Sequence, residues 1–191
     1  MEATAIDWKN DLIVSGSIDR SVFVWKYNES LKRFDPEFVN MDEKLSILDL
    51  KWANSAKKFV AGTSSKCLYV VHEFEDVNVK DVHWNAKLIK AKFESSILCC
   101  SFDPSSRVIA AASFDGSCKV ISAIIPGIDS EVGDGPFGKI NDFGTPILEF
   151  SCYFWLNHVS WSPSGNELCY LSHDATLNFV KINQEDCTIK G

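Results

Sequence analysis

The amino-acid sequence predicts an all-β protein, and three observations support this fold class. Short apolar segments, such as Leu12-Ile13-Val14 and Phe59-Val60-Ala61, are rich in β-forming residues. Each is followed by small and polar residues and then by a second apolar segment, which predicts a tight β-hairpin. The same hairpin pattern occurs four times along the 191 residues, as expected of repeated β-sheet units.

The repeated pattern is centred on one polar turn residue. In chain order this residue is Asp19, Ser65, Asp115 and Asp174. A hydroxyl residue stands two positions earlier in every copy: Ser17, Thr63, Ser113 and Ser172. A large apolar residue stands six positions later: Trp25, Val71, Ile121 and Val180. An Asp in such a turn accepts backbone N–H bonds, and a nearby hydroxyl can join the same polar network. We therefore interpret these residues as structural, with the Ser65 copy the weakest.

The upstream aromatic residues set the size of the repeat. They are Trp8, Trp52, Phe102 and Trp161, which lie 44, 50 and 59 residues apart. A four-stranded propeller blade takes about 40–45 residues, so the later intervals carry insertions. The chain is predicted to be one domain, a WD-repeat β-propeller of about four four-stranded blades that form an open or partial propeller.

The predicted repeats cover residues 1–44, 45–94, 95–155 and 156–191. Residues 37–39, 87–89 and 147–150 are the candidate outer strands of the first three. An ordinary β-sandwich is the alternative, but it does not account for hairpin chemistry at fixed offsets.

Residues 126–146 form the one conspicuous insertion. This segment holds five of the ten glycines and three of the six prolines. Its composition predicts a long surface loop, which is either a tolerated excursion or a partner-binding arm. In the second interpretation Phe137 and Phe143 are apolar anchors, and Pro136 and Gly138 flank the first of them.

Charge and cysteine content exclude several classes. The 19 basic and 26 acidic residues give a net charge of −7, which argues against nucleic-acid binding. We expect the lysines at 57, 58, 87, 90 and 92 to lie at solvated strand edges. The seven cysteines lack a C-x-x-C spacing and are expected to be reduced thiols of a cytosolic or nuclear protein. No apolar run reaches the roughly 20 residues of a membrane helix, and the first residues do not read as a secretory signal.

No motif favours catalysis, a metal or a cofactor. Ser172-His173-Asp174 is a turn, because the members of a catalytic triad converge from separate parts of a fold. Gly133–Gly138 lacks the Gly-Lys-Ser/Thr ending of a phosphate loop. His72, His83 and His158 are isolated from one another in the sequence. An enzyme would need a polar site converging in the central channel, and we expect none.

A more specific resemblance follows from several segments in order. They are Asp19–Trp25, Trp52-Ala53 with Lys57–Gly62, Ala111–Asp115, Cys118–Ala123, Pro136–Gly138, Trp155–Val159, Ser162–Gly165 and Ser172–Thr176. Together they resemble the WD-repeat subunit (subunit 1) family of the actin-related protein 2/3 complex, from about residue 5 to residue 180.

The resemblance implies a non-enzymatic scaffold that supports actin filament nucleation and branching, without a cofactor. Implied partners are the other subunits of the complex and, indirectly, the actin filament, in the cytoplasm at the actin cytoskeleton or in the nucleus. Neither nucleic-acid binding nor membrane insertion is implied. The family forms a seven-bladed propeller, and this chain matches only the second to fifth blades, which puts the family's actin contact in doubt. The alternative is a generic WD-repeat interaction scaffold in another cytoplasmic or nuclear complex.

Overall fold

The computed structural model describes residues 2–42, 44–75, 82–129, 136–140, 142–182 and 188–190. The described residues form sixteen β-strands and their connections, without a helix. The strands make four antiparallel sheets, in each of which four consecutive strands pair in chain order. This arrangement confirms the predicted fold class of four four-stranded blades.

The sheets follow one another along the chain. The first contains β1 (Ala3–Lys9), β2 (Leu12–Ser17), β3 (Val22–Asn28) and β4 (Arg33–Val39). The second contains β5 (Ile47–Trp52), β6 (Lys58–Thr63), β7 (Leu68–Glu75) and β8 (Val82–Ile89). The third contains β9 (Ile97–Phe102), β10 (Val108–Ser113), β11 (Ser117–Ser122) and β12 (Pro146–Ser151). The fourth contains β13 (Leu156–Trp161), β14 (Glu167–Ser172), β15 (Leu177–Lys181) and β16 (Thr188–Lys190).

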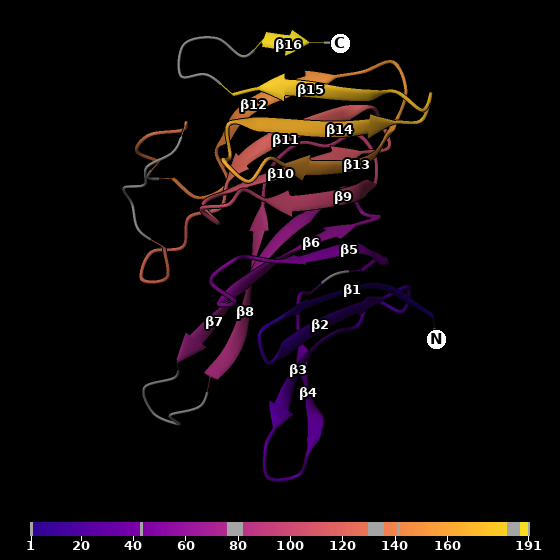
Figure 1. Ribbon diagram of the computed structural model, residues 1–191. Coiled ribbons are helices and arrows are strands. Elements are labelled where there is room, and N and C mark those ends of the chain that lie inside the picture. Colours follow the sequence, from indigo (N-terminus) through magenta and orange to yellow (C-terminus); the bar gives the residue numbers. More distant parts are fainter. Residues whose placement is uncertain are drawn as a thin grey trace.

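The first strands of the four sheets lie next to one another, β1 against β5, β5 against β9 and β9 against β13. Figure 1 shows the sheets stacked in chain order, with the first and the fourth at opposite ends. The described blades therefore form an open arc, as expected of part of a propeller.

Three hydrophobic clusters join adjacent sheets, and the inner strands of the two central sheets alternate between two of them. Phe59 and Ala61 of β6 pack toward the first sheet, whereas Val60 between them packs toward the third. All six residues of β6 and all six of β10 are buried, because the two central sheets are covered on both faces. The end sheets have one covered face, so β15 keeps an alternating pattern with only Val180 buried.

Two glycines allow the sheets to approach closely. A Cβ atom on Gly16 would lie 2.6 Å from Cγ2 of Ile47, and one on Gly62 would lie 2.9 Å from Cγ2 of Ile97. These distances are shorter than van der Waals contact, so each glycine leaves room for the isoleucine that begins the next sheet.

The expectation of a solvated strand edge is wrong for Lys58. Its side chain is fully buried, its Nζ donates a hydrogen bond to the Ala123 carbonyl at 2.7 Å, and it forms an ion pair with the Asp129 carboxylate. The reason is that β6 lies in a covered sheet and the start of the insertion brings a counter-charge to its end. Burial lowers the pKa of Lys58, and the Asp129 charge opposes this shift. Its neighbour Lys57 is exposed and pairs with Glu73 at 3.2 Å.

The other lysines differ in their surroundings. Lys90 and Lys92 are exposed, as expected of solvated positions. Lys87 is only half-buried, and its Nζ lies 5.7 Å from the ring centre of Phe143 in the insertion.

Candidate interaction surface

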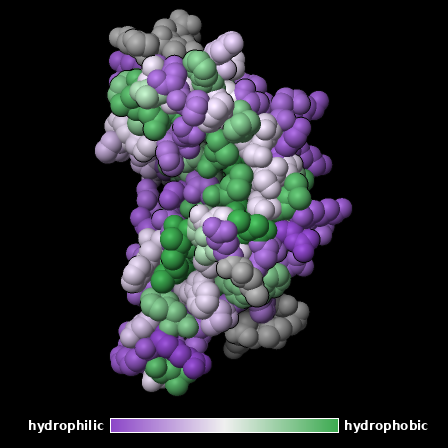
Figure 2. Space-filling model, turned by 90° about the vertical axis from the view of Figure 1, so that its right-hand side faces the viewer, coloured by the Kyte–Doolittle hydropathy of each residue, from purple (hydrophilic) through white to green (hydrophobic). Residues whose placement is uncertain are grey.

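The turns between the second and third strands of the four sheets form one rim of the molecule, seen face-on in Figure 2 with hydrophobic and hydrophilic residues interspersed. Three of these turns are closed by an aspartate. Asp19, Asp115 and Asp174 accept the backbone N–H of the residue two positions later, at 2.9, 2.7 and 3.1 Å. Hydrogen bonds from Ser21 and Thr176 lower the pKa values of Asp19 and Asp174, so both carboxylates are held in the charged form.

The hydroxyl residues of the repeat face into the same turns. Ser17 donates to the Glu2 carbonyl at 2.9 Å, and Ser113 donates to the Ser96 carbonyl at 3.1 Å. Thr63 donates to the Cys67 carbonyl at 2.9 Å and lies 2.8 Å from the Ser65 hydroxyl. The second turn therefore holds its shape through two hydroxyls where the others have a carboxylate.

Two further predicted residues lie within strands. Ser172 ends β14 and is buried, and its backbone N–H donates to the Thr176 carbonyl at 3.1 Å. Trp25 of β3 donates its indole N–H to the Ser15 hydroxyl at 2.8 Å. In this arrangement the repeat residues bond to neighbouring strands and turns of their own chain. Their structural role remains a prediction, and these bonds agree with it.

Sequence reasoning missed a second recurring bond. In each sheet, the residue before the central turn residue donates its N–H to the carbonyl of the residue that directly precedes the first strand. The pairs are Ile18 to Glu2, Ser64 to Ser46, Phe114 to Ser96 and His173 to Trp155, at 2.9 to 3.2 Å. Two of these acceptors also reach the preceding sheet, because the Ser46 hydroxyl donates to the Ile18 carbonyl and the Ser96 hydroxyl to the Ser64 carbonyl.

The fourth sheet replaces this serine bridge with aromatic stacking. Trp155 occupies the serine position, and its ring stacks on His173 of the same sheet at 3.6 Å between centroids. It also stacks on Phe114 of the third sheet at 5.0 Å. Beside it, Tyr153 and Phe154 form an edge-to-face pair at 5.0 Å. We call Phe114, Tyr153, Phe154, Trp155 and His173 the aromatic rim patch. The adjacent Tyr-Phe-Trp in the sequence was the signal that could have revealed it.

The described parts of the insertion are tied to the body of the protein. Phe137 packs its ring edge-on against Trp161, with centroids 5.8 Å apart. The Gly138 carbonyl accepts a hydrogen bond from the Arg107 guanidinium at 2.6 Å. Phe143 packs against the cluster between the second and third sheets. Pro136 is half-buried beside this segment, whereas residues 130–135 and 141 lie outside the described part. A partner-binding role for this loop remains a prediction.

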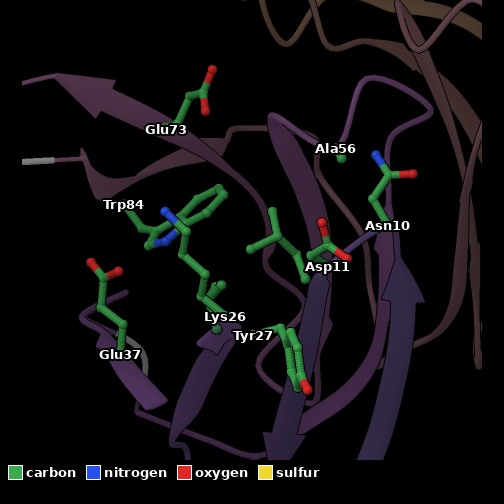
Figure 3. A pocket seen from close by; sticks show the side chains of 10 residues that line it. Asn10, Asp11, Lys26, Tyr27, Glu37, Ala56, Glu73 and Trp84 are labelled. Carbon is green, nitrogen blue, oxygen red and sulfur yellow. The ribbon is translucent and has the colours of Figure 1, made fainter. Parts of the chain in front are cut away.

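A cavity of about 340 Å³ opens between the first two sheets, at the end opposite the rim. It is lined by apolar residues and by the charged side chains of Asp11, Lys26, Glu37 and Glu73. Figure 3 shows Glu37 and Glu73 on opposite sides of the Trp84 ring, with Lys26 extending toward it. Glu73 is paired with Lys57, and Glu37 lies 3.9 Å from His83. The cavity can accept a polar group, but its charges are partly matched within the chain.

The cysteines and histidines do not come together at this surface. Cys99, Cys100 and Cys118 are buried free thiols, and burial raises the pKa of Cys99 to about 12. Among the described residues no three potential metal ligands lie close enough to hold an ion. The described residues also include no helix that is long and apolar enough to cross a membrane.

Comparisons with known proteins agree with this architecture. Residues 87–122 match the model of the WD domain, G-beta repeat. A computationally designed protein, Ika4, shares the fold with a TM-score of 0.67 over 95% of this chain and 92% of its own, at 14% identity. At that identity the likeness concerns the fold alone.

Curated relatives are more informative. Actin-related protein 2/3 complex subunit 1A of Arabidopsis thaliana is 31% identical over 180 residues, which are 93% of this chain and 46% of the relative. Subunit 1A-B of Xenopus laevis is 32% identical over 92% of this chain and 47% of its own length. Subunit 1 of Saccharomyces cerevisiae is 31% identical over 93% of this chain and 46% of its own. The chain thus spans about half the length of the curated relatives it matches, and across nearly all of its own length it is a WD-repeat relative of subunit 1 of the actin-related protein 2/3 complex.

Proposed function

We propose that the chain is a non-enzymatic scaffold subunit of the actin-related protein 2/3 complex, which supports actin filament nucleation and branching. The observation that carries this proposal is the 31% identity to subunit 1 over 180 residues, a span that includes strands of all four sheets. Its partners are then the other subunits of the complex and, indirectly, the actin filament. Its place is the cytoplasm at the actin cytoskeleton, with the nucleus as a second location.

The geometry supports a scaffold over a catalyst. The ring of His173 stacks on Trp155, and the Asp174 carboxylate accepts hydrogen bonds from the N–H and the hydroxyl of Thr176, as expected of residues in a turn rather than of a catalytic triad. Rigid sheets with an irregular rim are typical of proteins that bind other proteins through their loops.

Co-purification tests the proposal. A tagged chain expressed in its source cell should recover actin-related proteins and sister subunits, identified by mass spectrometry. Gly62→Val should abolish this recovery, because the added side chain collides with Ile97 and separates two sheets. Ser30→Val, at an exposed turn, is the matched control and should retain it. Recovery of the wild-type chain without any actin-related protein or sister subunit would refute the assignment.

A generic WD-repeat scaffold in another complex is the second candidate. The WD-repeat match over residues 87–122 supports this broader class without specifying a complex. The same experiment distinguishes the two candidates, because a consistent set of other proteins would identify the second.

A further inference from the structure

We infer that the aromatic rim patch docks an arginine-bearing segment of a partner protein. This inference rests on the proposed scaffold function and specifies the chemistry of one of its contacts. The patch combines exposed aromatic side chains on a loop that is held at both ends with carboxylates on turns that carry neither lysine nor arginine.

The loop that carries Tyr153 and Phe154 is held at both ends. The Cys152 N–H donates to the Gly116 carbonyl at 2.9 Å, and the Trp155 carbonyl accepts the His173 N–H at 3.0 Å. A Cβ atom on Gly116 would lie 2.5 Å from the Cys152 carbonyl oxygen, and the φ of +83° at Gly116 also favours glycine. The loop therefore lies directly on the neighbouring turn. Binding to such a preformed surface costs little conformational entropy.

The aromatic rings of this loop are exposed to solvent. Tyr153 is 95% exposed, and Phe114 and Phe154 are 49% and 38% exposed. Apolar residues that cluster on an exposed surface are typical of interaction sites. Tyrosine and tryptophan are also enriched among the residues that dominate binding energy at interfaces.

The charges around the patch are negative. Asp115 and Asp174 lie in the two turns that carry Phe114 and His173, and the Glu94 N–H donates to the Asp115 carboxylate at 2.8 Å. These turns and the 152–155 loop contain neither lysine nor arginine, whereas the first and second turns carry Arg20 and Lys66. The third and fourth sheets therefore present carboxylates without a neighbouring cation on the turns themselves.

Arginine fits this combination better than lysine. Its planar guanidinium stacks on aromatic rings and donates hydrogen bonds to carboxylates at the same time. The lysine ammonium is a more strongly hydrated point charge, so it gains less on a partly apolar surface. A short segment with arginine among apolar residues is the partner that matches both features.

Peptide selection tests this inference. A library of random short peptides displayed on phage is selected on the full chain and counter-selected on the double variant Tyr153→Ala/Phe154→Ala. We expect enrichment of arginine in the recovered peptides. A synthetic peptide of the enriched sequence should bind the wild-type chain about tenfold or more tightly than it binds the double variant. Replacing its arginine with glutamine should cause a similar loss, and lysine a smaller one.

The control variant is Phe74→Ala, another exposed aromatic residue far along the chain from the patch, which should leave peptide affinity unchanged. Melting curves of the variants check that the fold is retained. The inference is overturned if the peptides show no arginine enrichment, or if the double variant binds within about twofold of the wild type. Peptide binding without co-purification of the complex would reject only the proposed function, and co-purification without patch-dependent binding would reject only this inference.

Discussion

At the residue scale, Lys58 and Asp129 are the least expected pair in the protein. Both side chains are almost completely buried, 71 positions apart in the sequence. Removing one partner of a buried ion pair leaves a charge that neither solvent nor protein compensates. We expect Asp129→Asn to lower the free energy of unfolding by about 3 kcal/mol or more, measured by urea denaturation.

The adjacent lysine provides the control for this measurement. Lys57 pairs with Glu73 at the surface, with its side chain 57% exposed. Lys57→Met should therefore change stability by no more than about 1 kcal/mol. Equal effects of the two substitutions would contradict the assigned roles.

The same residues show where sequence reasoning ends. The hairpin residues Asp19, Asp115 and Asp174 were predictable, because each bonds to a residue two positions away. The burial of Lys58 was not, because it depends on a carboxylate in an insertion whose path no local pattern specifies. The aromatic rim patch was missed for a similar reason, since it joins two hairpin turns to the loop between their sheets.

At the scale of elements, the spacing between sheets depends on one position in each second strand. Three residues before the central turn residue, the four sheets have Gly16, Gly62, Ala112 and Leu171. The two glycines face the isoleucine that begins the following sheet, and a Cβ atom there would overlap it. The fourth sheet, which ends the described arc, has the large leucine at this position.

Gly62→Ala should consequently destabilise the protein by about 1–3 kcal/mol, the usual range for overpacking a filled core. Ile97→Ala removes the colliding methyl group, so the double variant should lose less stability than the two single variants summed. This double-mutant cycle is measured by chemical denaturation. Strict additivity would show that the two sheets do not touch at this point.

At the scale of the whole molecule, the outward face of the first sheet has the residues of a buried face. Ile6, Ser15, Phe23 and Phe38 form one row across its four strands, and Trp8, Ile13, Trp25 and Pro36 form the next. Ile13 and Trp25 pair across the second and third strands of the first sheet. The equivalent pairs in the other sheets are fully buried: Phe59 with Val71, Ile109 with Ile121, and Leu168 with Val180. Each of these packs toward the preceding sheet.

The outward face of the first sheet has no such sheet against it in the described structure, and Ile6 and Phe38 are 68% and 60% exposed. An uncovered apolar sheet face favours association with other chains. We expect the purified chain to associate as its concentration rises, measured by sedimentation velocity, and to have a low melting temperature.

The double variant Ile6→Lys/Phe38→Lys should remain monomeric, because two buried ammonium groups would oppose any packing on this face. Leu31→Lys/Phe74→Lys places the same charges at exposed apolar positions in the β3–β4 turn and in β7, and should associate like the wild type. A wild-type chain that stays monomeric and unfolds cooperatively at high temperature would show that this face is stable in water without a partner.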